Sequence, residues 1–240
     1  MSDVTRHSPL GMKRHFDPDT LELMDRPQPV SAELERDLHN IRRLNRWFGS
    51  YSLISFFLGR WIKPGARLQI VDLATGSGDI PRLIADYGRK VGAEVRIDAL
   101  DQQQATLAIA KRLSADHPNI VFIEANLLEW ESYETYDIVL CTMALHHFSE
   151  EDAIRVLRQC RKLSRKFVLV SDLRRSWFAT VGVKLLTATI FREPMTQHDA
   201  RLSMARAFSF FELDQLARQA GWENFGHRNF RFARQAIWLD

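Results

Sequence analysis

Short apolar runs alternate with longer amphipathic segments through the middle of the chain, and this alternation limits the folds open to it. Apolar runs of strand length and segments with helical periodicity follow one another in turn. We expect strands at 68–73, 95–100, 120–124, 137–142 and 167–172, and helices at about 79–90, 103–115, 150–163 and 209–220. Strands separated by helices form a parallel sheet with right-handed crossovers. The pattern therefore predicts an α/β fold with helices on both faces of the sheet.

The C-terminal part of the chain departs from this alternation. Residues 222–230 and 234–239 look like two strands joined by a short turn. They predict an antiparallel addition to a mostly parallel, seven-stranded sheet. Residues 173–208 are too many for a plain connection and include an apolar helix at 177–191, so we expect a helical cap over the active site.

The N-terminal part reads as an irregular lead-in of about 30 residues followed by two helices. Ser31 can cap the first helix, in which Leu34, Leu38 and Phe48 share one face. The second, from Ser50 to Ile62, is markedly apolar. A basic face on the first helix is either solvated or helps to line a substrate entrance; it carries Arg36, Arg42, Arg43 and Arg46. We expect residues 1–62 to form a lead-in and helical cap, and residues 63–240 the main domain with the cap insertion at about 173–208.

Composition excludes several classes of protein. With 33 basic and 30 acidic residues the net charge is +3, which is no concentrated basic patch, so no nucleic-acid partner is expected. Cys141 and Cys160 fall in or near expected core elements and are predicted to be reduced thiols. No apolar stretch reaches the roughly 18 residues of a membrane span, and the N-terminus has no apolar run. We therefore expect a cytoplasmic protein with no integral membrane segment.

A glycine-rich turn directly after the first apolar strand is the strongest local motif. It reads Asp72-Leu-Ala-Thr-Gly76-Ser-Gly78-Asp79 and leads into a helix. Glycines allow a ligand to approach the backbone closely, and the helix start offers free N–H groups. A dinucleotide fingerprint would need a small third residue where the chain has Pro81. A carboxylate at Asp72 suits a cationic ligand with an amino group better than a pyrophosphate.

Further polar residues close the next strands. Asp101 ends the second strand, where an acid can accept hydrogen bonds from ribose hydroxyls. Asn126 follows the third strand and either meets an adenine or belongs to a polar loop without a ligand. The buried segment 136–142 then runs into the pair His146-His147.

Taken in order, these motifs resemble those of class I S-adenosylmethionine-dependent methyltransferases. The resemblance rests on Asp-Leu-Ala-Thr-Gly-Ser-Gly-Asp, Leu-Asp, Ala-Asn and Cys-Thr-Met-Ala-Leu-His-His-Phe. It covers residues 65–175 and is closest to the small-molecule branch that includes ubiquinone- and menaquinone-pathway methyltransferases. It implies a Rossmann-like fold and S-adenosyl-L-methionine as cofactor. Ala74 departs from the family, which often has glycine there; the change is tolerable if the turn is not left-handed.

The resemblance also assigns parts of the cofactor to residues. It implies that Asp72, Gly76 and Gly78 bind the methionine half, that Asp101 holds the ribose, and that Asn126 lies by the adenine. Residues Cys141 to Met143 would line the sulfonium side. The cofactor-binding residues that we expect are Asp72, Ala74, Gly76, Gly78, Asp101, Gln102, Asn126, Leu127, Thr142 and Met143.

Three histidines are candidates for the general base that a phenol or enol acceptor needs. His146 and His147 follow the fourth main strand at its carboxyl edge, and His198 lies in the expected cap. The alternative is that they serve only packing. Asp172 closes the fifth strand and could touch a substrate. We expect no metal, because no carboxylate cluster suited to magnesium is evident.

The acceptor is expected to be a small molecule. The loop after the fourth strand lacks the Asn/Asp-Pro-Pro-aromatic signature of amine methylation on nucleic acids. We predict methyl transfer to a hydroxyl of an aromatic or polyketide-like acceptor. The alternatives are C-methylation of a quinol-type ring and a non-catalytic Rossmann-like nucleotide-binding protein.

Two apolar segments bear on the acceptor pocket. Residues 51–62 and 177–191 suit an oily pocket, a membrane-surface contact or ordinary core packing. In the first case Trp177, Phe178 and Phe57 line the pocket. The oligomeric state is left open between a monomer and a homodimer.

Overall fold

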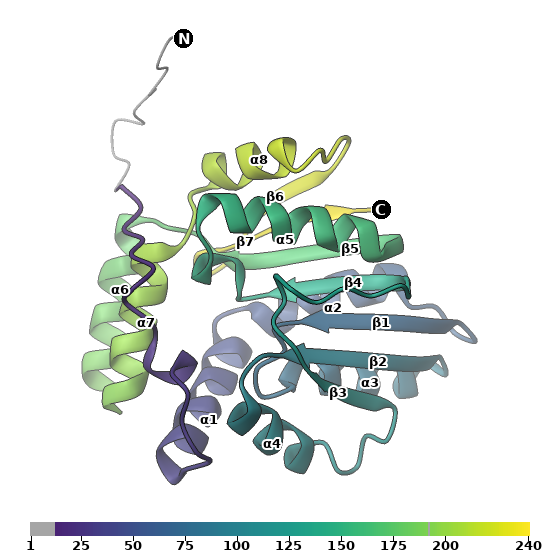
Figure 1. Cartoon of the computed structure of the whole chain (residues 1–240), viewed down its shortest axis with the longest axis horizontal. Helices are drawn as coiled ribbons and strands as arrows, with labels where there is room; N and C mark the ends of the chain where they lie inside the picture. The colour runs from purple at the N-terminus through teal and green to yellow at the C-terminus, as the bar shows by residue number, and fades with distance from the viewer. Residues whose placement is uncertain (1–12, 192) are drawn as a thin grey trace.

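The computed structural model describes residues 13–191 and 193–240, and a seven-stranded sheet forms its centre (Figure 1). The strand order is β3-β2-β1-β4-β5-β7-β6. The strands are β1 (Arg67–Leu73), β2 (Glu94–Asp101), β3 (Ile120–Glu124), β4 (Tyr136–Thr142), β5 (Ser164–Leu173), β6 (Gly226–Phe230) and β7 (Arg234–Leu239). The first five are parallel, and β7 runs antiparallel to both β5 and β6. The predicted mostly parallel sheet with an antiparallel C-terminal strand is confirmed.

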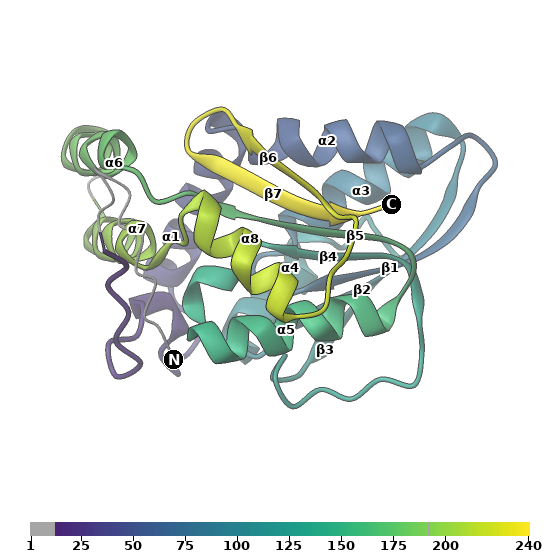
Figure 2. The same cartoon turned by 90° about the horizontal axis from the view of Figure 1, so that it is seen from above.

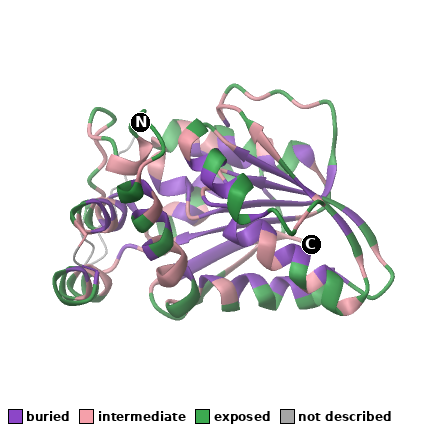
Figure 3. Ribbon diagram, turned by 90° about the horizontal axis from the view of Figure 1, so that it is seen from below, coloured by how far each residue is buried: buried purple, intermediate pink, exposed green. Residues whose placement is uncertain are grey.

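Helices cover both faces of the sheet, as Figure 2 shows. On one face lie α2 (Ser50–Trp61) and α3 (Asp79–Val91), and on the other α5 (Glu150–Leu163) and α8 (Phe210–Gln219). Helix α4 (Gln104–Leu113) packs beside β2 and β3. The central strands are buried along most of their length, whereas the outer faces of these helices are exposed (Figure 3). Burial on both sides explains why the core strands read as continuous apolar runs.

Three further helices gather at the carboxyl ends of the parallel strands (Figures 1 and 2). These cap helices are α1 (Ala32–Trp47), α6 (Trp177–Thr189) and α7 (Pro194–Arg206), and α7 contacts both of the others. A short 3-10 helix, η1 (Leu23–Asp25), is fixed to α7 because the Asp199 carboxylate accepts hydrogen bonds from the Leu23 and Met24 N–H groups at 2.7 and 3.0 Å. The lead-in is thereby held against the cap.

The structure differs from the sequence expectations at three elements. Helix α7 was not predicted. The residues on its buried side are largely polar, so the sequence shows no apolar stripe with helical periodicity there. Helix α2 belongs to the main core rather than to the cap, because Phe57 and its apolar neighbours pack against α3 and the sheet. Strand β6 begins at Gly226 instead of residue 222, since Trp222 is buried and its indole N–H donates to the Leu157 carbonyl at 3.0 Å.

Two smaller expectations, the cap of α1 and the reduced cysteines, are confirmed. The Ser31 hydroxyl caps α1 by accepting from the Leu34 N–H at 3.1 Å. Cys141 and Cys160 are free and buried. None of the helices in the described ranges is both long and apolar enough to cross a membrane.

Candidate active site

A cavity of about 850 Å³ lies beneath the cap helices at the carboxyl ends of the strands. Its floor comes from the ends of β1, β2 and β4, and its walls from η1 and the three cap helices. Ligands of open α/β sheets bind at this edge, where neighbouring strands connect in opposite directions. Here β1 lies between β2 and β4, which places the glycine turn after β1 at that position.

The glycine turn has left-handed backbone at three positions. Ala74, Gly76 and Gly78 have φ values of 59°, 55° and 69°. The backbone at Ala74 is therefore left-handed. The condition under which the sequence would tolerate alanine there, a turn that is not left-handed, is not met. Gly76 lines the cavity. Gly78 does not; an added Cβ would lie 3.0 Å from the Phe122 ring, so this glycine permits close packing rather than ligand approach.

Asp101 joins the end of β2 to the glycine turn. Its Oδ2 accepts from the Gly76 N–H at 2.8 Å and its Oδ1 from the Gln103 N–H at 2.9 Å. Burial raises the pKa of Asp101, against the effect of these two hydrogen bonds. The cavity lining includes Asp101 together with three neighbours predicted from the sequence, namely Gln102, Asn126 and Leu127.

Two acids of the turn have different surroundings. Asp72 is fully buried, does not line the cavity, and its Oδ2 accepts from the Thr75 hydroxyl at 2.7 Å. Burial raises its pKa to about 7. Asp79 does line the cavity, and its Oδ2 accepts from Asn45 and Tyr51, each at 3.1 Å. Asp72 thus holds the turn from behind, while Asp79, which we did not single out from the sequence, faces the ligand space.

The end of β4 supplies Thr142 and Met143 to the cavity, as predicted. Cys141 does not reach it and lies fully buried in the core. Arg234 from β7 is buried beside Met143 and donates to its Sδ, and burial lowers the pKa of Arg234 to about 10. No sequence motif marked this arginine, because β7 lies far along the chain from β4.

His146 and Asp172 form a buried pair at the cavity wall. His146 lies in the short helix η2 (Leu145–His147) that follows β4, and Asp172 lies near the end of β5. The Asp172 carboxylate contacts His146 Nδ1 at 2.6 Å and accepts from the His146 backbone N–H at 2.8 Å. Burial acts to raise the pKa of Asp172, but the contacts with His146 outweigh it and lower that pKa.

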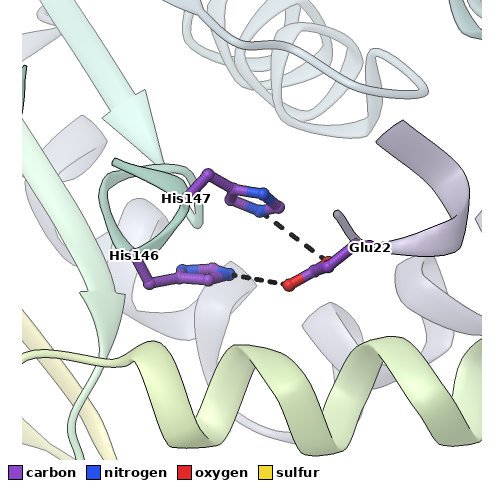
Figure 4. A group of neighbouring side chains, drawn as sticks. All are labelled: Glu22, His146 and His147. Atoms are coloured by element: carbon purple, nitrogen blue, oxygen red, sulfur yellow. Dashed lines mark ion pairs between the residues drawn. The ribbon is translucent and has the colours of Figure 1, made fainter. Parts of the chain in front are cut away.

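His147 lies beside His146 and faces two further acids. The two rings are 4.3 Å apart between centroids. His147 Nδ1 contacts Asp25 Oδ2 at 2.8 Å, and the Nε2 atoms of both histidines face the Glu22 carboxylate (Figure 4). Burial acts to lower the pKa of His147, but Glu22 and Asp25 outweigh it and raise that pKa to about 10. Burial also raises the pKa of Glu22.

Several residues expected at the acceptor lie elsewhere. His198 is exposed on α7 and outside the cavity, with its Nδ1 2.8 Å from Asp199. Phe57 is completely buried in the core, and Trp177 is 58% exposed on the outside of α6. Phe178 does line the cavity, although it is 81% exposed. None of the four α1 arginines is part of the cavity lining, which favours the solvated face.

The acceptor side of the cavity has one apolar and one polar wall. Helix α6 contributes apolar side chains, including Val183 and Leu186. Helix α7 contributes buried polar ones, including Asp199 and Ser203, and Glu22 directly before η1 adds another.

Comparison with known proteins identifies the central part of the chain. Residues 70–166 match the methyltransferase domain family. This segment is therefore similar to methyltransferase domains. It contains the glycine turn, Asp101, Asn126 and the His146-His147 pair, and therefore most of the cavity floor.

Two curated relatives of the chain carry the names of quinone methyltransferases. The chain is 30% identical over 145 residues to demethylmenaquinone methyltransferase of Thermotoga maritima, covering 55% of this chain and 60% of that protein. It is 35% identical over 101 residues to 2-phytyl-1,4-naphtoquinone methyltransferase of Thermosynechococcus vestitus, covering 41% of this chain and 44% of that protein. The chain thus aligns with less than two thirds of either relative.

A solved plantazolicin methyltransferase in complex with SAH has the same fold, with a TM-score of 0.64, 12% identity, and coverage of 88% of this chain and 91% of that one. Such low identity supports the fold alone. The similarity to methyltransferases in sequence rests on the family match and the two curated relatives.

The cavity residues fit S-adenosylmethionine on their own chemistry. The carboxylate of Asp101 can accept from ribose hydroxyls, and the amide of Asn126, which also lines the cavity, can hydrogen-bond to an adenine. The Asp79 carboxylate suits the cofactor's ammonium and sulfonium charges better than it suits a phosphate. No P-loop motif and no third glycine of a dinucleotide fingerprint is present in the sequence.

Proposed function

We propose that the protein transfers the methyl group of S-adenosylmethionine to a hydroxyl of a small aromatic or polyketide-like acceptor bound between α6 and the histidine pair. The observation that carries this proposal is a single cavity lined both by Asp101 and Asn126 and by His146. The cofactor residues and the candidate base therefore share one enclosed space. When bound, S-adenosylmethionine supplies an electrophilic methyl group on its sulfonium.

The chain's own residues can prepare the acceptor oxygen. A phenol or enol is a weak nucleophile until its proton is removed. The Asp172 carboxylate holds His146 through Nδ1, so that Nε2 is the ring atom available to take a proton from the acceptor. The cap helices cover this space and limit the access of water. Positioning within the cavity then supplies much of the rate.

C-methylation of a quinol-type ring is the second candidate. It is favoured by the names of the two quinone methyltransferase relatives. A quinol carbon also becomes nucleophilic when the ring hydroxyl is ionised, so His146 serves either reaction. A non-catalytic Rossmann-like nucleotide-binding protein would bind the cofactor but transfer nothing.

Methyl transfer from S-adenosylmethionine with a deuterated methyl group tests these alternatives. The acceptors are a long-chain phenol, a quinol and a polar amine, and NMR of the product locates the new methyl group. We expect an oxygen-bound methyl on the phenol. A carbon-bound methyl on the quinol favours the second candidate, efficient methylation of the polar amine contradicts the proposal, and no transfer to any acceptor favours the binding protein.

Two matched histidine variants test the base. His146→Gln should lower kcat by about 100-fold or more while leaving SAH affinity nearly unchanged. His117→Gln is the control, because His117 also contacts a carboxylate, Asp86 at 3.1 Å, but does not line the cavity. Equal kcat values in the two variants would exclude His146 as the base.

A further inference from the structure

Three side chains from distant parts of the chain converge at the cavity wall. Glu22, His146 and His147 each offer one ligand atom, and these atoms lie within 4.8 Å of one another. His146 Nε2 is 3.8 Å from Glu22 Oε1, and His147 Nε2 is 3.9 Å from Glu22 Oε2. Figure 4 shows both rings directed at the same carboxylate. Glu22 and His146 are almost fully buried, and all three residues line the cavity.

Each of the three residues is held in place by a further polar group. Asp172 contacts Nδ1 of His146 at 2.6 Å, and Asp25 contacts Nδ1 of His147 at 2.8 Å. The Ser203 hydroxyl donates to Glu22 Oε1 at 2.7 Å. Metal-binding histidines almost always have a carboxylate, carbonyl or water on the second ring nitrogen, which fixes the ring and leaves the other nitrogen for the metal. Both histidines show that arrangement.

We propose that Glu22, His146 and His147 bind one divalent transition-metal ion, zinc or iron(II). Two imidazoles and one carboxylate with an open side towards a cavity are the donor set of catalytic zinc and of non-haem iron(II). Magnesium prefers oxygen ligands and is a poor match for two imidazoles. Binding of the ion at these residues requires neither the cofactor nor an acceptor.

The three ligand atoms lie within 4.8 Å of one another, so they must move closer together to hold one ion. Zinc bonds of about 2.0–2.1 Å in a tetrahedral site place neighbouring ligand atoms about 3.3 Å apart. The observed Nε2–Oε separations of 3.8 and 3.9 Å are therefore about half an ångström too wide.

A metal ion here would change the part that His146 plays. Its Nε2 would be a ligand rather than a proton acceptor. The open side of the ion would face the acceptor space, where a metal lowers the pKa of a bound hydroxyl. This role rests on the proposed function, whereas the binding itself does not.

Cobalt(II) is a suitable probe, because its visible absorption reports the ligands directly. The protein, freed of any histidine tag and treated with a chelator, is titrated with cobalt(II), which zinc should then displace. We expect saturation at one ion per chain. Glu22→Gln and His147→Gln should each weaken binding at least tenfold, and Asp172→Asn by about 10- to 100-fold through the loss of support for His146. The control His117→Gln should bind as the wild type does.

Two results would overturn the proposal: no saturable one-to-one binding by the wild type, or unchanged binding by both Glu22→Gln and His147→Gln. X-ray absorption of the zinc-loaded wild type needs no variant; it should show two imidazole nitrogens, and a different number of imidazoles or a sulfur ligand would contradict the site. SAH binding by each variant serves as the check that it is folded. Because cobalt binding is read without cofactor or acceptor, failure of the proposed methyl transfer would leave this result unaffected.

Discussion

Asp101→Asn is the most informative substitution, because both carboxylate oxygens accept hydrogen bonds from backbone N–H groups. Oδ2 accepts from the Gly76 N–H and Oδ1 from the Gln103 N–H. An asparagine of the same size must direct its NH₂ at one of these two donors, since it has only one acceptor oxygen. The lost hydrogen bond and the donor left unpaired should cost about 1–3 kcal/mol of folding stability.

The same change should weaken cofactor binding separately. A ribose hydroxyl would lose its charged acceptor, and such hydrogen bonds contribute about 1.5–3 kcal/mol. The Kd for SAH, measured by isothermal titration calorimetry, should therefore rise by about 10- to 150-fold. The control is Asp116→Asn, at an exposed position outside the cavity. If urea unfolding shows the loss of stability while the Kd stays within twofold, Asp101 organises the turn but does not hold the ligand.

Three further predictions follow from the cavity. Gly76→Val should abolish SAH binding in a protein that still melts cooperatively by circular dichroism. An added Cβ has no protein neighbour within 4 Å, so the valine side chain would enter the cavity, and the φ of 55° disfavours a β-branched residue. Normal SAH binding by this variant would show that the turn is not part of the site. Because the pKa of His147 is raised to about 10 in the folded protein, this residue should contribute stability below pH 6.5 that is lost as the pH rises towards 10. The free energy of unfolding, measured by urea unfolding of the chelator-treated proteins, should fall more steeply with rising pH for the wild type than for His147→Gln. Equal slopes for the two proteins would refute the raised pKa of His147. Hydrogen exchange in α1, α6 and α7, but not in α2, should slow when SAH and an acceptor bind together, and protection limited to residues 65–130 would contradict closure of the cap.

The sheet and the cofactor side of the cavity could be predicted from the sequence because both depend on local patterns. Strands buried on both faces are uninterrupted apolar runs, so their limits are visible from the residues alone. In a parallel sheet the residues that follow each strand meet at one edge. This is why Gly76, Asp101, Asn126 and Met143 could be placed together before the structure was known, and all four line the cavity.

The acceptor side could not be predicted in the same way, because it depends on contacts between distant segments. Glu22 lies in an irregular lead-in with no periodic pattern, and only folding brings it to His146. Helix α7 was not recognised because its buried side is largely polar. The hydrogen bond from Ser203 on this helix to Glu22 could therefore not be predicted either. The sequence prediction of no metal rested on the two isolated cysteines and on the lack of a carboxylate cluster suited to magnesium, and it stays a prediction. For the apolar residues of α2 the sequence left pocket, membrane contact and core open, because hydrophobicity alone does not distinguish a core face from a ligand face.

Isothermal titration of the wild-type protein with S-adenosylmethionine, SAH and NADH tests the central claim most directly. The cavity has acids where a dinucleotide would place its pyrophosphate, so S-adenosylmethionine and SAH should each bind with one site per chain, and NADH should give no measurable heat of binding. Binding of NADH, or no binding of SAH at concentrations well above those typical of cofactors, would contradict the assignment of this cavity to S-adenosylmethionine.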